Sequence, residues 1–247
     1  MNKFLTLAFL FSAGCVIGWC IELLYRRFSP ANTSKSWINP GFLIGPYLPI
    51  YGFGLCALYL LAGLEQYITI NNPIASKILL FAAMAVCMTV IEYIAGIIFI
   101  KKMNVKLWDY SNEPFNFQGV ICLRFSVYWM LLGAVYYFFV HPYILGALDW
   151  FSRNLAFSFV IGVFYGVFAV DVFYSFRIVT KIRKFAKENE VLIKYEELKR
   201  HIRDVSKERK EKYRFIFALR SPRPLHETLK AYIEEQKRKA EQQRKKG

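Results

Sequence analysis

The chain has 247 residues, of which 55% are hydrophobic, and it carries a formal net charge of +15 at neutral pH. The apolar residues come in long blocks, which excludes an ordinary soluble domain and indicates an integral membrane protein. Neither the five cysteines nor the three histidines have the spacing of a metal or redox site, so we expect no metal ligands and no cofactor.

Five apolar segments have about the length that a helix needs to cross the core of a bilayer. They cover residues 4–24, 47–65, 77–100, 125–140 and 154–176, and the fourth has an alternative start at Val120. The first segment ends in two arginines without a small-residue cleavage site, so we expect it to be retained. The sequence therefore predicts an all-α membrane protein, with about five transmembrane helices in residues 1–176 and a cytoplasmic helical C-terminal tail in residues 177–247.

Basic residues gather on one side of these segments. The tail has 23 Lys and Arg against 11 Asp and Glu, and the two loops on the same side add Arg26, Arg27, Lys35, Lys101, Lys102, Lys106 and Arg124. Segments on the opposite side have one basic residue each, Lys3, Lys77 and Arg153. Because cytoplasmic loops carry the excess of Lys and Arg, we expect the N-terminus outside and the C-terminus in the cytoplasm.

The loop between the first two segments is rich in residues that disfavour helix. Residues 39–54 contain three prolines and four glycines. Irregular backbone at membrane depth must be buried in protein, line a wet cavity or lie at the interface. Two interpretations stay open: a broken helix at a transport site, and a bent helix entrance with a tight turn.

Small residues four apart occur in two of the segments. Gly14 and Gly18 lie in the first segment, and Gly162 and Gly166 lie in the fifth. Such pairs let helices approach closely in lipid, so we expect both pairs at helix contacts.

Four acidic residues fall in or beside the segments toward the same predicted face: Glu22, Glu92, Asp109 and Asp171. Carboxylates at apolar depth are costly and are usually paired or functional. Arg124 is the nearest cation by topology, and an Arg–carboxylate pair is well suited to hold such a charge. The residues leave two hypotheses open: a buried ion pair that joins helices, or a site for a substrate, an ion or a proton.

In the tail, apolar residues recur every three or four positions from Ile178 to Val205, with one gap of seven between Phe185 and Leu192. This period predicts an amphipathic helix that continues from the fifth segment, long enough for a coiled coil or for packing on the membrane surface. A break at Ser221 to Pro224 precedes a second predicted helix that ends near Gln242. The basic charge favours anionic lipid head groups, and no nucleic-acid motif is present.

Several ordered motifs resemble one bacterial family of integral membrane proteins, the ABC-transporter permeases of type IV (CmpB-like). The resemblance covers roughly residues 1–176 and lies in residues 18–26, residues 39–54, Glu92-Tyr93, Trp108-Asp109-Tyr110-Ser111, Phe115-Asn116, residues 119–123 and Trp129. It implies a permease in the bacterial cytoplasmic (inner) membrane. The basic tail lies outside the resemblance.

The leading hypothesis is a transporter or permease subunit of unknown substrate, with a polar site open to the cytoplasm. We expect its substrate path to be lined by Glu22, Asn39, Tyr47, Tyr51, Glu92, Asp109, Asn116 and Arg124, and we assign no catalytic residue. The chain has no G-x-x-x-x-G-K-[ST] phosphate loop, so ATP use requires a separate ATPase subunit. Five helices are few to enclose a transport path, so we expect a homodimer or another protein partner. Membrane lipid is a further expected partner.

Two alternatives stay open. The first is a membrane enzyme that acts on a lipid-linked substrate at the inner leaflet, with Glu92 or Asp109 as the acid or base. The second is a membrane scaffold that recruits partners through its basic tail.

Overall fold

The structure is a computed structural model that describes residues 2–29, 32, 35–208, 219 and 224–244. It is almost entirely helical, as predicted. Eight α-helices are described: α1 (Lys3–Phe28), α2 (Pro49–Gly63), α3 (Pro73–Met103), α4 (Leu123–Val135), α5 (His141–Arg153), α6 (Ser158–Glu188), α7 (Tyr195–Glu208) and α8 (Leu225–Arg244). Four two-residue strands accompany them: β1 (Val105–Lys106), β2 (Asn116–Phe117), β3 (Ile121–Cys122) and β4 (Ile193–Lys194).

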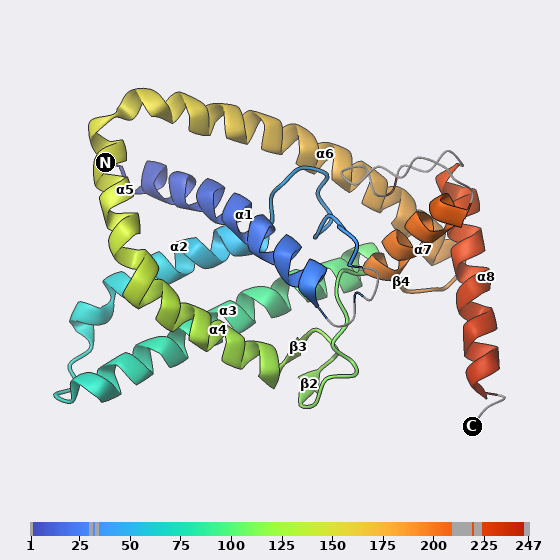
Figure 1. The fold of residues 1–247 in the computed structure, drawn as a ribbon, viewed down its shortest axis with the longest axis horizontal. Helices are drawn as coiled ribbons and strands as arrows, with labels where there is room; N and C mark the ends of the chain where they lie inside the picture. The colour runs from blue at the N-terminus through green and yellow to red at the C-terminus, as the bar shows by residue number, and fades with distance from the viewer. Residues whose placement is uncertain (1, 30–31, 33–34, 209–218, 220–223, 245–247) are drawn as a thin grey trace.

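Four helical stretches of the described chain are long and apolar enough to cross a membrane. They are Lys3–Phe28, Pro73–Met103, Leu123–Arg153 and Leu155–Glu188. The second predicted span corresponds to α2, whose 15 residues measure about 22 Å. Helix α2 runs back alongside α1 (Figure 1), so the count of about five is close to what the structure has.

Local sequence signals explain where the long helices begin and end. The side chain of Asn72 accepts hydrogen bonds from the backbone amides of Ile74 and Ala75, and Pro73 takes the first turn of α3. Asn104 ends α3 in a left-handed conformation with φ of 53°, which asparagine tolerates better than most residues. Helix α4 runs into a π-helical turn, Tyr136–Val140, and α5 then begins at His141 with Pro142 in its first turn.

The predicted glycine contact in the first span is confirmed, and the one in the fifth span is wrong within this chain. A Cβ atom on Gly14 would lie 2.9 Å from the backbone oxygen of Tyr51, and one on Gly18 would lie 2.2 Å from the Cβ atom of Tyr51. Helices α1 and α2 therefore touch through their glycines. At Gly162 and Gly166 a Cβ atom would meet nothing within 4 Å among the described residues.

The tail folds back on the bundle, and the prediction of one continuous helix to Val205 is wrong. Helix α6 ends at Glu188, Glu190 adopts a positive φ of 51°, and β4 pairs in parallel with β1, Ile193 opposite Val105. Helix α7 then packs against α6 and α8, which buries Val179, Ile182, Phe185, Leu198, Ile202, Leu229 and Tyr232 in one apolar cluster.

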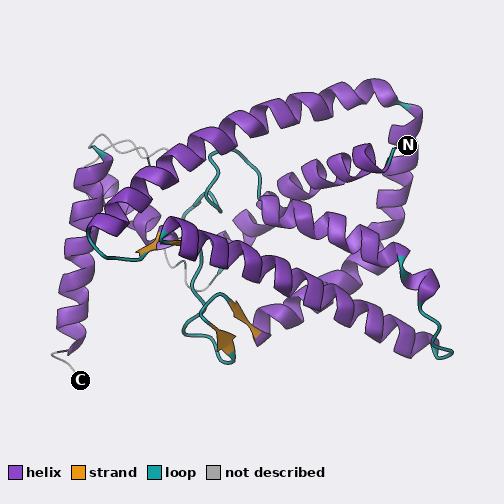
Figure 2. Cartoon of the chain, turned by 180° about the vertical axis from the view of Figure 1, so that it is seen from behind, coloured by secondary structure: helices purple, strands orange, loops and turns teal. Residues whose placement is uncertain are grey.

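Most of the apolar repeat of the tail is thus packed inside the chain, although Leu192 is 48% exposed, and the predicted coiled coil is not confirmed. The second predicted helix corresponds to α8, whereas residues 221–223 of the predicted break lie outside the described residues. Figure 1 and, from behind, Figure 2 show α7 and α8 at the end of the bundle where α3 and α6 end, far from the N-terminus. Helix α5 lies at the other end, beside the N-terminus.

Candidate functional site

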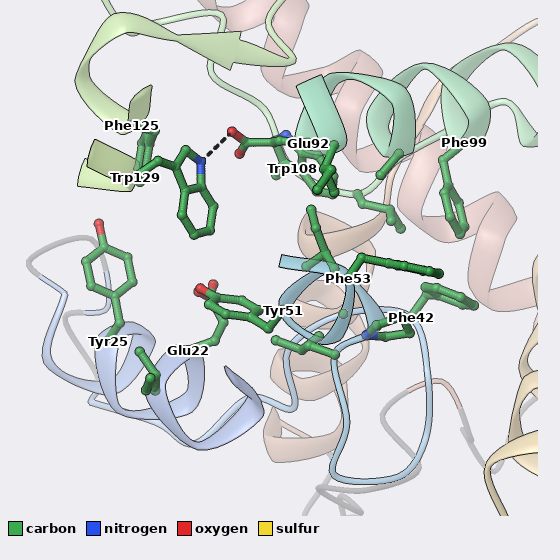
Figure 3. Close-up of a pocket in the computed structure, with 18 of the residues that line it drawn as sticks. Glu22, Tyr25, Phe42, Tyr51, Phe53, Glu92, Phe99, Trp108, Phe125 and Trp129 are labelled. Carbon is green, nitrogen blue, oxygen red and sulfur yellow. Dashed lines mark hydrogen bonds between the residues drawn. The ribbon is translucent and has the colours of Figure 1, made fainter. Parts of the chain in front are cut away.

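A large groove opens among the helices at the end of the bundle near the tail. Its volume is about 1110 Å³, and its lining residues come from α1, α2, α3, α4, α6 and α7 and from the loops that follow α1 and α3. The walls are mostly apolar, and the charged lining residues are Glu22, Arg26, Glu92, Glu196 and Arg200. Figure 3 shows side chains of α1, α2, α3 and α4 pointing into this space.

Glu92 is the most deeply buried acid of the groove. It lies on α3 with 4% of its surface exposed. One carboxylate oxygen accepts a hydrogen bond from the hydroxyl of Tyr110 at 3.0 Å, and the other accepts one from Nε1 of Trp129 at 3.0 Å (Figure 3). The indole N–H of Trp129 can only donate, so the Glu92 oxygen that it contacts is an acceptor. Among the described residues, Glu92 has no ion-pair partner.

Glu22 takes part in a second polar cluster on the opposite wall. Its carboxylate accepts hydrogen bonds from the hydroxyl of Tyr51 at 3.1 Å and from Nε of Arg26 at 2.7 Å. Arg26 also pairs with Glu196 of α7 at 2.6 Å. Burial raises the pKa of Glu196, but the charges of Arg26 and Lys199 outweigh that effect and hold the pKa below its usual value. One guanidinium therefore joins the first span to the tail.

The loop from Asn39 to Leu48 is held in place by side chains from three helices. Nε1 of Trp19 donates to the Asn39 side chain at 2.6 Å, and the Asn39 amide group donates to the backbone oxygen of Ile44 at 2.9 Å. The carboxylate of Asp171 accepts hydrogen bonds from the backbone amides of Ile44 and Gly45 at 3.1 and 2.6 Å. Lys199 of α7 donates to the backbone oxygens of the loop from the other side. The loop is an ordered entrance to α2.

Five of the eight predicted substrate contacts lie outside the groove lining. Asp109 pairs with Lys106 at 2.7 Å and with Lys194 of the tail at 2.9 Å, and Asn116 bonds within its own loop. Tyr47 is buried against Phe164 and Phe168. Asn39 and Arg124 are likewise absent from the lining, and Glu22, Tyr51 and Glu92 belong to it.

The expected pairing of Arg124 with the membrane acids is wrong. Arg124 pairs with Glu113 at 3.3 Å and donates to the hydroxyl of Tyr128 at 3.1 Å, with 52% of its side chain exposed. The cation that pairs with Glu22 is Arg26, one helical turn away. A spacing of four residues places two side chains on the same face of a helix, so this pair could have been recognised in the sequence. Glu196 and Arg200 enter the groove from α7, and no local sequence signal marks them.

The described residues hold no group of three or more His, Cys, Asp or Glu side chains that could bind a metal ion. The groove instead combines apolar walls, the single carboxylate of Glu92, a charged cluster around Arg26 and several hydroxyl and indole donors. This arrangement is suited to binding a molecule with an apolar body and a polar or charged group.

A comparison with protein families agrees with this architecture. The family described as Putative ABC-transporter type IV matches residues 9–176, which cover most of α1, all of α2 to α5 and more than half of α6. The chain belongs to this family. No curated protein and no solved structure matches the chain. The matched range contains every wall of the groove except Glu196 and Arg200, which lie in α7.

Proposed function

We propose that the chain is the permease subunit of an ABC-type transporter and that its substrate passes through the groove. The observation that carries this proposal is the position of Glu92: a nearly buried carboxylate on a membrane helix that borders a cavity of about 1110 Å³. Buried ionisable groups in membrane helices mark substrate or ion pathways. Family membership supports the same role.

Within this proposal, Glu22, Tyr51 and Glu92 contact the substrate, and Arg26 and Trp129 position the two carboxylates. The groove opens to the cytoplasm, because the basic ends of α1 and α3 lie beside it. The N-terminus is then outside the cell, and the basic tail contacts anionic lipid of the bacterial cytoplasmic membrane. A second copy packs on α6 at Gly162 and Gly166, where the chain itself offers no contact within the described residues.

The energy source is a separate ATPase subunit in this proposal. The test is affinity purification of the tagged chain from its native membranes in a mild neutral detergent, followed by mass spectrometry and an ATP hydrolysis assay. We expect a co-purified chain with a phosphate-loop motif and vanadate-sensitive ATP hydrolysis. A matched purification of Glu92→Gln should retain the partner, since that substitution is internal to the groove. A pure complex that lacks both a phosphate-loop chain and ATP hydrolysis contradicts the ATP-driven permease.

A further inference from the structure

The groove is unusually rich in aromatic side chains. Of the 36 residues that line it, 13 are Phe, Tyr or Trp. Trp129 lies between Glu92 and the opposite wall, and its ring meets that of Tyr51 edge to face at a centroid distance of 5.8 Å (Figure 3). Electron-rich ring faces attract cations, above all in a desolvated site. An aromatic wall beside a carboxylate is therefore complementary to a positive charge.

The charges of the lining leave one carboxylate without a cation. Glu22 and Glu196 share Arg26, at 2.7 and 2.6 Å. Arg200 is exposed on α7. Glu92 is held by the neutral donors Tyr110 and Trp129 alone, among the described residues. A hydroxyl and an indole stabilise an anion but do not neutralise it, so a ligand with a positive charge completes this site.

We propose that the groove binds an amphipathic organic cation, an inference that rests on the permease function proposed above. The cationic head lies beside Glu92 and against the rings of Trp129 and Tyr51. The apolar body lies along Phe42, Phe53 and Phe99, which line the same groove on the side away from Trp129 (Figure 3). A hard metal cation is a poor fit, because such ions need about six oxygen ligands and these walls are mainly apolar.

Such a cation has two sources, the lipid phase and the aqueous phase. Phe53, Leu60 and Ile94 line the groove and are each more than half exposed, so the groove has an apolar flank in the membrane-spanning region. An amine-headed lipid enters by that flank, whereas a soluble lipophilic cation enters from the cytoplasm. Both present the same chemistry to Glu92.

The test uses the full chain and two probes. In neutral detergent, binding of radiolabelled tetraphenylphosphonium is measured by scintillation proximity, with neutral triphenylphosphine oxide as the competitor. In nanodiscs, energy transfer from tryptophan to a dansyl-labelled dialkyl trimethylammonium lipid is compared with transfer to a zwitterionic lipid that carries the same label. We expect saturable binding of at least one cationic probe and no competition by the neutral compound. Binding of the first probe alone assigns the soluble source, and binding of the second alone assigns the lipid.

Substitutions at one position separate charge from shape. Glu92→Gln should lower the affinity for the cationic probe by at least about tenfold. The affinity of Glu92→Asp should stay within about threefold of that of the parent, since the charge is kept. Glu113→Gln is the matched control, because Glu113 pairs with Arg124 outside the groove lining, and it should leave the affinity unchanged. Each variant is accepted only with a monodisperse elution profile, and where the glutamine variant is unstable the neutral competitor triphenylphosphine oxide reports on the need for charge.

The inference fails if neither cation binds saturably, if triphenylphosphine oxide competes equally, or if Glu92→Gln binds as the parent does. These results leave the permease proposal standing wherever the ATPase subunit still co-purifies. Conversely, Glu92-dependent cation binding without any ATPase partner overturns the permease proposal and retains the site.

Discussion

Lys199 of the tail donates through Nζ to the backbone oxygen of Asn39 at 2.8 Å. The same ammonium reaches the backbone oxygen of Gly41 at 3.1 Å and pairs with Glu196 at 2.7 Å, and only 2% of its side chain is exposed. Burial lowers the pKa of Lys199. A tail residue thus holds the loop that leads into α2, so the position of α7 and the shape of the groove entrance are linked.

The first prediction concerns that contact. Lys199→Met keeps the length of the side chain and removes its donors, which leaves two backbone oxygens without this partner and Glu196 with Arg26 as its remaining cation. Buried groups left without partners cost about 1–3 kcal/mol each. We expect faster hydrogen exchange in residues 39–48 and 195–208, measured by mass spectrometry. Lys230→Met is the control, since Lys230 is exposed on α8, and equal exchange in both variants would contradict the link.

The second prediction compares two arginines. Arg26 bridges Glu22 and Glu196 with 26% of its side chain exposed, so Arg26→Gln leaves Glu22 without a cation and Glu196 with Lys199 alone. Removing one partner of a buried ion pair costs about 3–5 kcal/mol, and partial exposure brings the expected loss nearer to about 2 kcal/mol. We expect a clear fall in Tm for Arg26→Gln and none for Arg124→Gln, whose side chain is exposed. A larger fall in Tm for Arg124→Gln than for Arg26→Gln would show that Arg124 is the principal cation that stabilises the membrane acids.

The third prediction concerns acid. Burial raises the pKa of Asp109, but hydrogen bonds from Lys106, Ser111 and Lys194 outweigh that effect and hold the pKa well below its usual value. A carboxylate whose folded pKa is depressed adds stability above its unfolded pKa, about 3.9, and loses it as the pH falls through the folded value. The contact between Asp109 and the tail should therefore be constant from pH 8 to 5 and weaken below about pH 4.

The check is limited proteolysis of the tail between pH 3 and 8, with an acid-tolerant protease at the low end. Asp109→Asn should loosen β4 and α7 already at pH 7, because it removes the charge that pairs with Lys194. It should also show a smaller further change in acid than the parent chain. An acid response that is identical in the two chains would assign the pH dependence to other groups.

The spans were predictable because each is a long apolar run in the sequence. Glu22, Tyr51 and Glu92 were predictable as neighbours because the alternating direction of the spans brings all three toward the same predicted face of the membrane. Arg124 was assigned wrongly as the partner of these acids. The cation that pairs with Glu22 is Arg26, which lies one turn away on the same helix. The packing of α7 back on the bundle could not be predicted from the sequence, because it depends on the pairing of Ile193 with Val105 across 88 positions of sequence. The division at residue 177 stays a prediction, and α6 crosses it without a break.

The last prediction uses two glycines as a matched pair. In Gly18→Ala the new Cβ atom would lie 2.2 Å from both the Cβ and the Cγ atoms of Tyr51, which belong to the base of the side chain and not to its flexible end. Either α1 moves away from α2, or Tyr51 turns and loses its hydrogen bond to Glu22. Overpacking of this kind costs about 1–3 kcal/mol, so the Tm should fall by several degrees.

Gly162→Ala adds the same methyl group to α6, where nothing lies within 4 Å among the described residues. It also replaces glycine by the best helix former, so at a dilution that keeps the chain monomeric the Tm should hold or rise. Thermal unfolding of the two variants and the parent chain in one detergent decides the matter. Equal losses would mean that Gly162 is also packed, and a concentration-dependent loss for Gly162→Ala alone would assign that packing to a second copy. If the Tm falls only for Gly18→Ala, the contact between α1 and Tyr51 is the one that shapes this wall of the groove.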